Sequence, residues 1–191
     1  MEGRLVIVSA PSGSGKTTIV QYLLECNLDL EFSVSATTRQ KRENETDGKD
    51  YFFLTVPEFR ERIERDQFVE WQEVYTDNYY GTPRSEIVRI RLKGHHVLFD
   101  VDVMGGINLK RIFGNDSVSL FIMPPSVKEL EKRLRGRATD SEDKIRMRIR
   151  KAEEEIKAAG SFDHIIVNDD LEKAKAEARR IVSSFIKGKL S

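Results

Sequence analysis

The stretch LVIVSAPSGSGKTTIV, residues 5–20, joins an apolar run to a glycine-rich loop and the start of a helical pattern. The phosphate-loop pattern is Gly, any four residues, then Gly-Lys-Ser/Thr, and residues 10–17 match it except that Ala10 replaces the first glycine. Glycines at positive φ let backbone amides converge on phosphate oxygens, and Gly13 and Gly15 are kept. Position 10 lies at the exit of the apolar run, where a negative φ admits the smallest side chain. The stretch therefore predicts a strand, a phosphate-binding loop and a helix, in that order.

The loop predicts a site for the triphosphate of a nucleotide. Its amides and the positive end of the following helix would face the same anion. Lys16 supplies a cation for the β- and γ-phosphates, and the Thr17 hydroxyl is a suitable ligand for Mg²⁺. A simple Gly/Ser turn before a helix is the competing interpretation. The predicted ATP-binding residues here are Ser12, Gly13, Ser14, Gly15, Lys16, Thr17 and Thr18.

Length and composition favour one compact domain without an overall charge. The chain has 191 residues, and its 32 Lys and Arg balance its 32 Asp and Glu. No net positive field favours nucleic acid or an anionic membrane, and the apolar runs are shorter than a membrane span. The N-terminus lacks a signal-peptide layout, so we expect a cytoplasmic protein. The single cysteine, Cys26, is expected to be buried in a helix and excludes an intrachain disulfide.

Short β-branched runs alternate with helical periodicity, which is typical of a parallel sheet covered by helices. Between the second and third runs, aromatic and polar residues alternate, which predicts a small inserted antiparallel lobe. Paired capping residues mark helix starts at Thr55, Ser126, Thr139 and Asp169. The fold class predicted is α/β, a three-layer P-loop NTPase-type parallel sheet. Its five strands are expected at 5–10, 32–37, 96–102, 118–123 and 164–168.

Several further segments resemble guanylate kinase along almost the entire chain. They are FSVSATTRQKRENETDGKDYFF (32–53), FVEWQEVYTDNYYGT (68–82), LFDVDVMGG (98–106), the basic helical stretch 126–150 and IIVNDDL (165–171). The resemblance implies a single domain with its core at 1–34, 94–125 and 155–191, an acceptor-binding lobe at about 35–93 and a lid at about 126–154. It implies transfer of the γ-phosphoryl group of MgATP to GMP, giving ADP and GDP, in guanine nucleotide synthesis and salvage. The enzyme would be an ATP-dependent nucleoside monophosphate kinase, a monomer or a homodimer, with dGMP a further acceptor left open.

The resemblance also implies residues for the acceptor. Guanidinium forks and phenolic hydroxyls suit a monophosphate, and a carboxylate with nearby hydroxyls suits the edge of guanine. Adenine lacks the two donors that such a carboxylate would accept, so the wrong base would leave it unpaired. The predicted GMP-binding residues are Ser35, Arg39, Arg42, Glu45, Tyr51, Glu70, Tyr80, Thr82, Asp100 and Asp102.

Motif positions of the family extend to metal, lid and adenine contacts. Asp100 would assist the Mg²⁺ ion at Thr17 through water, and Asn168 would lie beside adenine or simply cap a helix. The catalytic residues implied are Lys16 with the lid arginines Arg133, Arg137 and Arg148. The chain departs from frequent family choices at Ala10, Lys41, Glu43, Asn44 and Met104.

Two other functions stay open at this point. Guanylate-kinase-like domains also serve as scaffolds for partner peptides after losing catalytic groups, but Lys16 and Thr17 are retained here. A related kinase with another small acceptor would not need the guanine-type set of Glu70, Ser35 and Thr82.

Overall fold

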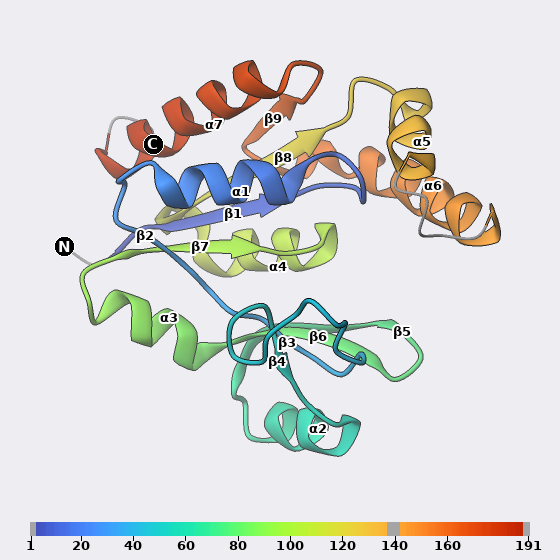
Figure 1. Cartoon of the computed structure of the whole chain (residues 1–191). Helices are drawn as coiled ribbons and strands as arrows, with labels where there is room; N and C mark the ends of the chain where they lie inside the picture. Colours follow the sequence, from blue (N-terminus) through green and yellow to red (C-terminus); the bar gives the residue numbers. More distant parts are fainter. Residues whose placement is uncertain (1–2, 137–141, 189–191) are drawn as a thin grey trace.

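A five-stranded parallel sheet forms the body of the protein, and its strand order is β2-β7-β1-β8-β9. The computed structural model describes residues 3–136 and 142–188 (Figure 1). The central strand β1 is buried along its whole length, as expected for a strand with layers on both faces. The strands are β1 (Leu5–Ser9), β2 (Leu30–Phe32), β7 (His96–Asp100), β8 (Ser117–Met123) and β9 (His164–Val167).

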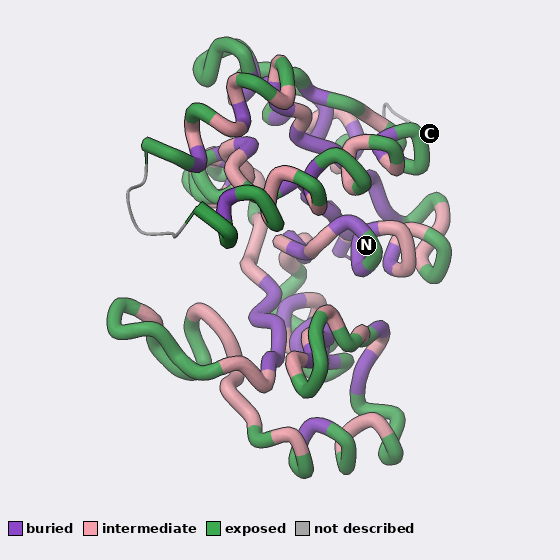
Figure 2. Tube along the Cα trace, turned by 90° about the vertical axis from the view of Figure 1, so that its right-hand side faces the viewer, coloured by how far each residue is buried: buried purple, intermediate pink, exposed green. Residues whose placement is uncertain are grey.

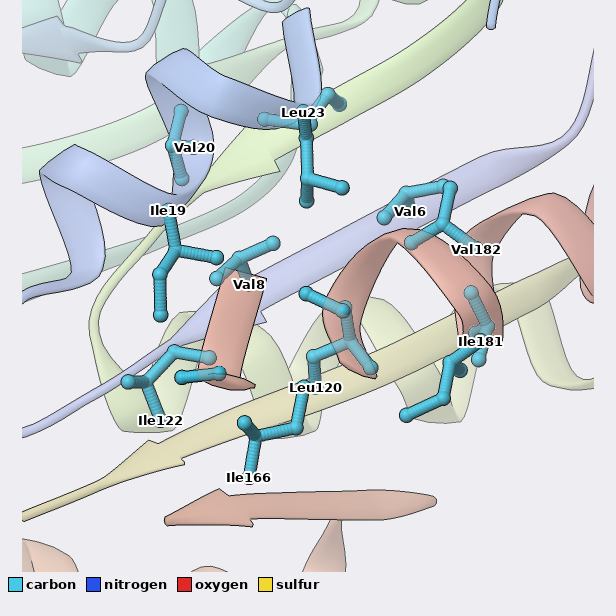
Figure 3. Packing of buried hydrophobic residues seen from close by; sticks show 14 of the residues in the cluster. Val6, Val8, Ile19, Val20, Leu23, Leu120, Ile122, Ile166, Ile181 and Val182 are labelled. Atoms are coloured by element: carbon cyan, nitrogen blue, oxygen red, sulfur yellow. The ribbon is translucent and has the colours of Figure 1, made fainter. Parts of the chain in front are cut away.

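Helices cover both faces of this sheet. On one face, α1 (Lys16–Glu25) and α7 (Leu171–Ile186) pack onto β1 and β8, with Ile19, Leu23 and Val182 in the core shown in Figure 3. On the other face, α3 (Arg84–Arg91) and α4 (Val103–Phe113) bury Ile90 and Leu109 against the sheet. Two short 3₁₀ turns, η1 (Gly114–Asp116) and η2 (Ala159–Ser161), precede β8 and β9. The predicted three-layer α/β class is thus confirmed.

The predicted lobe is a second sheet of order β4-β3-β6-β5, which lies below the body in Figure 1. Its small core stacks Phe59 between Phe68 and Tyr79, at ring centroid distances of 4.4 and 5.3 Å. The sheet is antiparallel except for the pair of β3 and β4. Its elements are β3 (Ala36–Thr37), β4 (Phe52–Phe53), α2 (Val56–Glu64), β5 (Phe68–Tyr75) and β6 (Asn78–Pro83).

A pair of helices, α5 (Val127–Arg135) and α6 (Glu142–Lys157), lies at one end of the sheet, in the stretch expected to form a lid, and is called the lid below (Figure 1). They share a small apolar core of Leu130, Leu134 and Ala152. Ser126 caps α5 by accepting from the Glu129 amide at 3.1 Å, as expected. In Figure 2 the buried segments run through the sheet body and continue into the lobe.

Three sequence expectations need correction. The run 32–37 is not one strand, because its start belongs to β2 of the body and its end to β3 of the lobe. Asp170, not Asp169, caps α7, since its carboxylate accepts from the Glu172 amide at 3.0 Å. Cys26 is only half-buried, because it lies just beyond the last turn of α1.

The capping position Thr139 lies outside the described residues. Thr55 caps α2 in a complete capping box with Glu58, as predicted. In the two described stretches, no helix has the length and apolar composition needed to cross a membrane.

Candidate functional site

A cleft of about 420 Å³ opens where the body, the lobe and the lid meet. The phosphate loop and the carboxyl ends of β1 and β7 form its floor, which is where open α/β sheets bind ligands. Strand β5 of the lobe and helix α6 of the lid form its walls. The predicted residues that line it are Ser12, Gly13, Gly15, Lys16, Thr17, Thr18, Ser35, Tyr51, Glu70, Tyr80, Asp100, Asp102 and Arg148.

The phosphate loop has the backbone that its sequence predicts. Gly13 and Gly15 adopt φ values of 94° and 93°, in the region that side chains disfavour, whereas Ala10 does not have a positive φ and is buried. Alanine at the first pattern position therefore fits without strain. Gly15 precedes the first residue of α1, so the helix begins at Lys16 with its free amides facing the cleft.

Lys16 reaches from α1 across to the end of β7. Its Nζ donates to the Val101 carbonyl at 2.8 Å and forms an ion pair with Asp100. These contacts hold the ammonium group extended in the floor of the cleft. Thr17 and Thr18 are exposed and line the same floor, so their hydroxyls are accessible to a ligand.

Asn168 lies beneath the phosphate loop. Its Nδ2 donates to the Ser14 carbonyl at 2.7 Å, and the residue is buried. A Cβ on Gly15 would come within 2.3 Å of the same nitrogen, so this glycine is needed for the close approach as well as for its φ. Neither Asn168 nor the buried Ser14 lines the cleft. The structure thus gives Asn168 a role in holding the loop.

The carboxylate of Glu70 lies in the lobe wall of the cleft and is buried to 9% exposure. Burial raises its pKa to about 7, and the negative charge of Asp102 adds to this effect. The buried Thr82 hydroxyl donates to Glu70 Oε1 at 2.7 Å, and Ser35 lines the same pocket. A buried carboxylate with one oxygen near Gly105 and hydroxyls beside it is suited to a ligand that presents donors.

Arg39 is held by three side chains of the lobe. Its guanidinium donates to Glu45 through two nitrogens, one at 2.7 Å, and lies over the rings of Tyr51 and Phe53 at 4.9 and 5.6 Å. This bidentate pair lowers the pKa of Glu45 to about 2. Glu45 therefore orients Arg39, and neither residue is part of the cleft lining.

The other residues predicted to bind the monophosphate differ in exposure; they are Tyr51, Tyr80 and Arg42. Burial raises the pKa of Tyr51 to about 12, so this phenol is a donor at neutral pH. The Tyr51 and Tyr80 rings meet edge to face at 6.1 Å, and both line the cleft. Arg42 is exposed and does not line it, although its backbone amide donates to Glu45 at 2.9 Å.

The two strand-terminal aspartates have separate partners. Asp100 pairs with Lys16, whereas Asp102 caps α4 by accepting from the Gly105 amide at 2.8 Å. The second carboxylate oxygen of Asp102 accepts from the side-chain amide of Gln72. Asp102 is thus fixed between the body and the lobe.

The predicted lid arginines do not all reach the cleft. Arg148 lines it, but Arg133 donates to the Asn168 carbonyl at 3.1 Å outside the lining. Arg137 lies outside the described residues. Sequence reasoning missed Lys151 and Glu155, which also line the cleft. Their spacing from Arg148 places all three on one helix face, which is the signal that could have found them.

On β5, Gln72 lines the cleft with Glu70, although it was not among the predicted site residues. Alternation along the strand is the signal, since residues two apart share a face. Tyr75, at the end of the strand, lines it as well.

The chain is similar in sequence and in structure to guanylate kinases. The family model described as guanylate kinase matches residues 2–185. A guanylate kinase of Bacteroides thetaiotaomicron is 52% identical over 97% of this chain and 91% of its own length. One of Porphyromonas gingivalis is 47% identical over 96% and 98%. The crystal structure of guanylate kinase from Anaplasma phagocytophilum superposes with a TM-score of 0.79 at 32% identity, covering 97% of this chain and 87% of that one.

Proposed function

The chain belongs to the guanylate kinase family, and from this premise we propose how its cleft carries out the reaction. It is an ATP-dependent nucleoside monophosphate kinase that phosphorylates GMP to GDP in guanine nucleotide metabolism. The proposal concerns which residues bind each substrate. One observation carries it: the buried Glu70 carboxylate, with Thr82 beside it, lines the same cleft as the phosphate loop.

ATP binds on the loop side of the cleft. The amides at the start of α1 and the loop glycines surround its phosphates, and the Lys16 ammonium meets the β- and γ-phosphates. Asn168 holds the phosphate loop in place through its hydrogen bond to the Ser14 carbonyl. Arg148, on the lid wall, adds positive charge from the opposite side.

GMP binds on the lobe side. Ionised Glu70 accepts from the N1–H and the 2-amino group of guanine, and the Ser35 hydroxyl serves the O6 side. Thr82 holds the Glu70 carboxylate in place, because its hydroxyl donates to Glu70. Arg39, fixed by Glu45 and flanked by Tyr51, receives the 5′-phosphate together with Tyr80. Arg42 contributes from the exposed edge of the same loop.

The acceptor atom is an ionised phosphate oxygen of GMP, so the site needs no strong general base. Catalysis rests on holding the two phosphates in line and on stabilising the charge of the transferring group by Lys16 and Arg148. Closure of the lobe and the lid over both substrates would exclude water from this meeting point. Arg137 is proposed to act with them, as the family motif implies.

A magnesium ion is expected with the ATP. The described residues contain no cluster of three or more His, Cys, Asp or Glu side chains that could hold a metal. That fits a Mg²⁺ ion bound mainly by substrate phosphates and water, with oxygen ligands from the protein at Thr17 and, through water, Asp100. When bound, the ion neutralises charge on the β- and γ-phosphates.

The enzyme is proposed to work in the cytoplasm, where ATP and nucleoside monophosphates are present, as a monomer or a homodimer. The scaffold alternative is set aside, because the chain belongs to an enzyme family and keeps Lys16 and Thr17.

The test is a turnover assay with purified protein, MgATP and equal concentrations of GMP, AMP, CMP and UMP, followed by ADP release. The kcat/KM for GMP is expected to be at least about 10²-fold higher than for the other three nucleotides, because the wrong base leaves the buried Glu70 unpaired. Turnover with AMP or UMP but not with GMP would refute the proposed acceptor pocket.

A further inference from the structure

The lobe and the lid contact each other across the cleft. The contact joins Tyr75, at the end of β5, to Lys151, on α6: the ammonium nitrogen lies 5.4 Å from the centre of the phenol ring. Both side chains line the cleft. This distance is within the range at which an aromatic ring attracts a cation. It is a specific contact between two parts of the molecule that each carry a proposed substrate site.

Strand β5 also contacts the body. Three residues before Tyr75, the Gln72 side chain donates to Asp102 at the start of α4. Glu70, on the same strand, is the proposed base-binding carboxylate. A ligand that moves β5 therefore acts on a strand with contacts to the body at one point and to the lid at another.

Lys151 shares a helix face with Arg148, and both line the cleft. Its Nζ also lies 3.8 Å from Glu155, one turn further along, which steadies the ammonium group on this face. Because α6 is a continuous helix from Glu142 to Lys157, a shift of Lys151 carries Arg148 with it. Arg148 is thus linked to Tyr75 of the lobe through α6 and Lys151.

We propose that Tyr75 and Lys151 are positioning residues that couple GMP binding in the lobe to closure of the lid over ATP. This inference rests on the proposed function of the two sides of the cleft. GMP draws β5 inward, Tyr75 holds Lys151, and α6 brings Arg148 toward the phosphates. The coupling is reciprocal, so ATP must also tighten GMP binding by the same factor.

The expected size follows from the exposure of the contact. Tyr75 is 49% exposed and the Lys151 side chain 41%, so the interaction is a partly solvated one. Such contacts change an equilibrium about two- to five-fold. Loss of either partner should therefore reduce the mutual tightening of the two substrates by about this factor.

The experiment measures the Kd of GMP by calorimetry with and without a saturating nonhydrolysable ATP analogue and Mg²⁺. The coupling is the Kd of GMP without the analogue divided by the Kd of GMP with it. The variants are Tyr75→Leu and Lys151→Met, their conservative counterparts Tyr75→Phe and Lys151→Arg, and the double variant Y75L/K151M. Lys157→Met is the matched control, because Lys157 lies on the same helix and pairs only with Glu154 among the contacts described.

Wild type and Lys157→Met are expected to show a ratio above one. Tyr75→Leu and Lys151→Met should each lower this ratio about two- to five-fold, whereas Tyr75→Phe and Lys151→Arg should keep most of it. The double variant should show the same ratio as either single variant.

Three results would overturn the proposal: a ratio of one in the wild type, wild-type ratios in both single variants, or additive losses in the double variant. Additive losses would mean that Lys151 acts on the phosphates independently of Tyr75. Wild-type protein that binds no GMP at all would instead refute the proposed function, and the coupling with it.

Discussion

Replacing Glu70 with Gln is expected to stabilise the fold and destroy the activity at the same time. Burial raises the pKa of Glu70 from an ordinary 4.5 to about 7, so its ionised form is disfavoured in the folded protein. Each tenfold change in proton affinity corresponds to about 1.4 kcal/mol, and the ionised carboxylate therefore costs about 3 kcal/mol of folding free energy at pH 8. A neutral amide of the same shape removes this cost, and its oxygen can still accept from Thr82.

The sign of the pH dependence follows from the direction of the shift. The folded state binds the Glu70 proton more tightly than the unfolded chain, so the stabilisation by this proton is present below pH 4.5 and is lost as the pH rises through 7. The stability gap between Glu70→Gln and wild type should therefore be about 3 kcal/mol at pH 8 and below about 1 kcal/mol at pH 5. For a chain of this length the gap at pH 8 corresponds to a Tm increase of roughly 6–12 °C.

Thermal unfolding of both proteins at pH 5 and pH 8 measures the gap, and turnover with GMP measures the functional loss. The kcat/KM of Glu70→Gln for GMP should fall at least about 10²-fold, because the amide replaces a charged acceptor with a group that also carries donors. Glu73→Gln is the matched control, since Glu73 is exposed on the same strand and accepts only from the Asp77 amide among the described contacts. A gap of equal size at both pH values, or undiminished GMP turnover in Glu70→Gln, would refute the reasoning.

Four further outcomes follow from the same geometry. Lys16→Met should lower kcat by about 10³-fold or more while the protein stays folded, and a steady-state assay showing near-normal turnover would contradict its role at the phosphates. The KM for GMP should rise about tenfold between pH 8 and pH 6 as Glu70 takes up its proton, whereas a flat profile of KM against pH would show that the ionised form is not required. Glu45→Gln should raise the KM for GMP by roughly three- to tenfold with little change in kcat, because Arg39 loses one of its two fixed bonds; the idea fails if kcat falls and KM does not move. Asn168→Ala should raise the KM for ATP roughly tenfold and leave the Kd of GMP unchanged, and equal weakening of both substrates in calorimetry would argue for a general loss of structure instead.

The sequence alone determined those features that depend on neighbours in the chain. The phosphate loop is one, because two glycines, a lysine and a threonine at fixed spacing specify the backbone and the first turn of α1. Four of the five body strands are another, since the short β-branched runs at 5–10, 96–102, 118–123 and 164–168 predict buried strands within one or two residues of their observed ends. The resemblance to a known family supplied the acceptor residues, and those that line the cleft are Ser35, Tyr51, Glu70, Tyr80, Asp100 and Asp102.

Tertiary structure alone decided which distant segments meet. The run 32–37 carries one continuous strand pattern, but alternation does not say that its two ends belong to different sheets. Asp102 could be read as a ligand of substrate or as a helix cap, and only the approach of β5 shows that Gln72 and the Gly105 amide occupy both of its oxygens.

Asn168 and Lys151 show the same limit. A side chain's local pattern fixes the face on which it lies, but not the group it meets, and Asn168 meets a carbonyl 154 positions away. The lobe, the body and the lid fold from separate stretches of chain, so contacts such as that of Tyr75 with Lys151 depend on how these parts pack. The sequence thus specified the chemistry available to this protein, and packing decided which of those groups face the cleft and which hold the others in place.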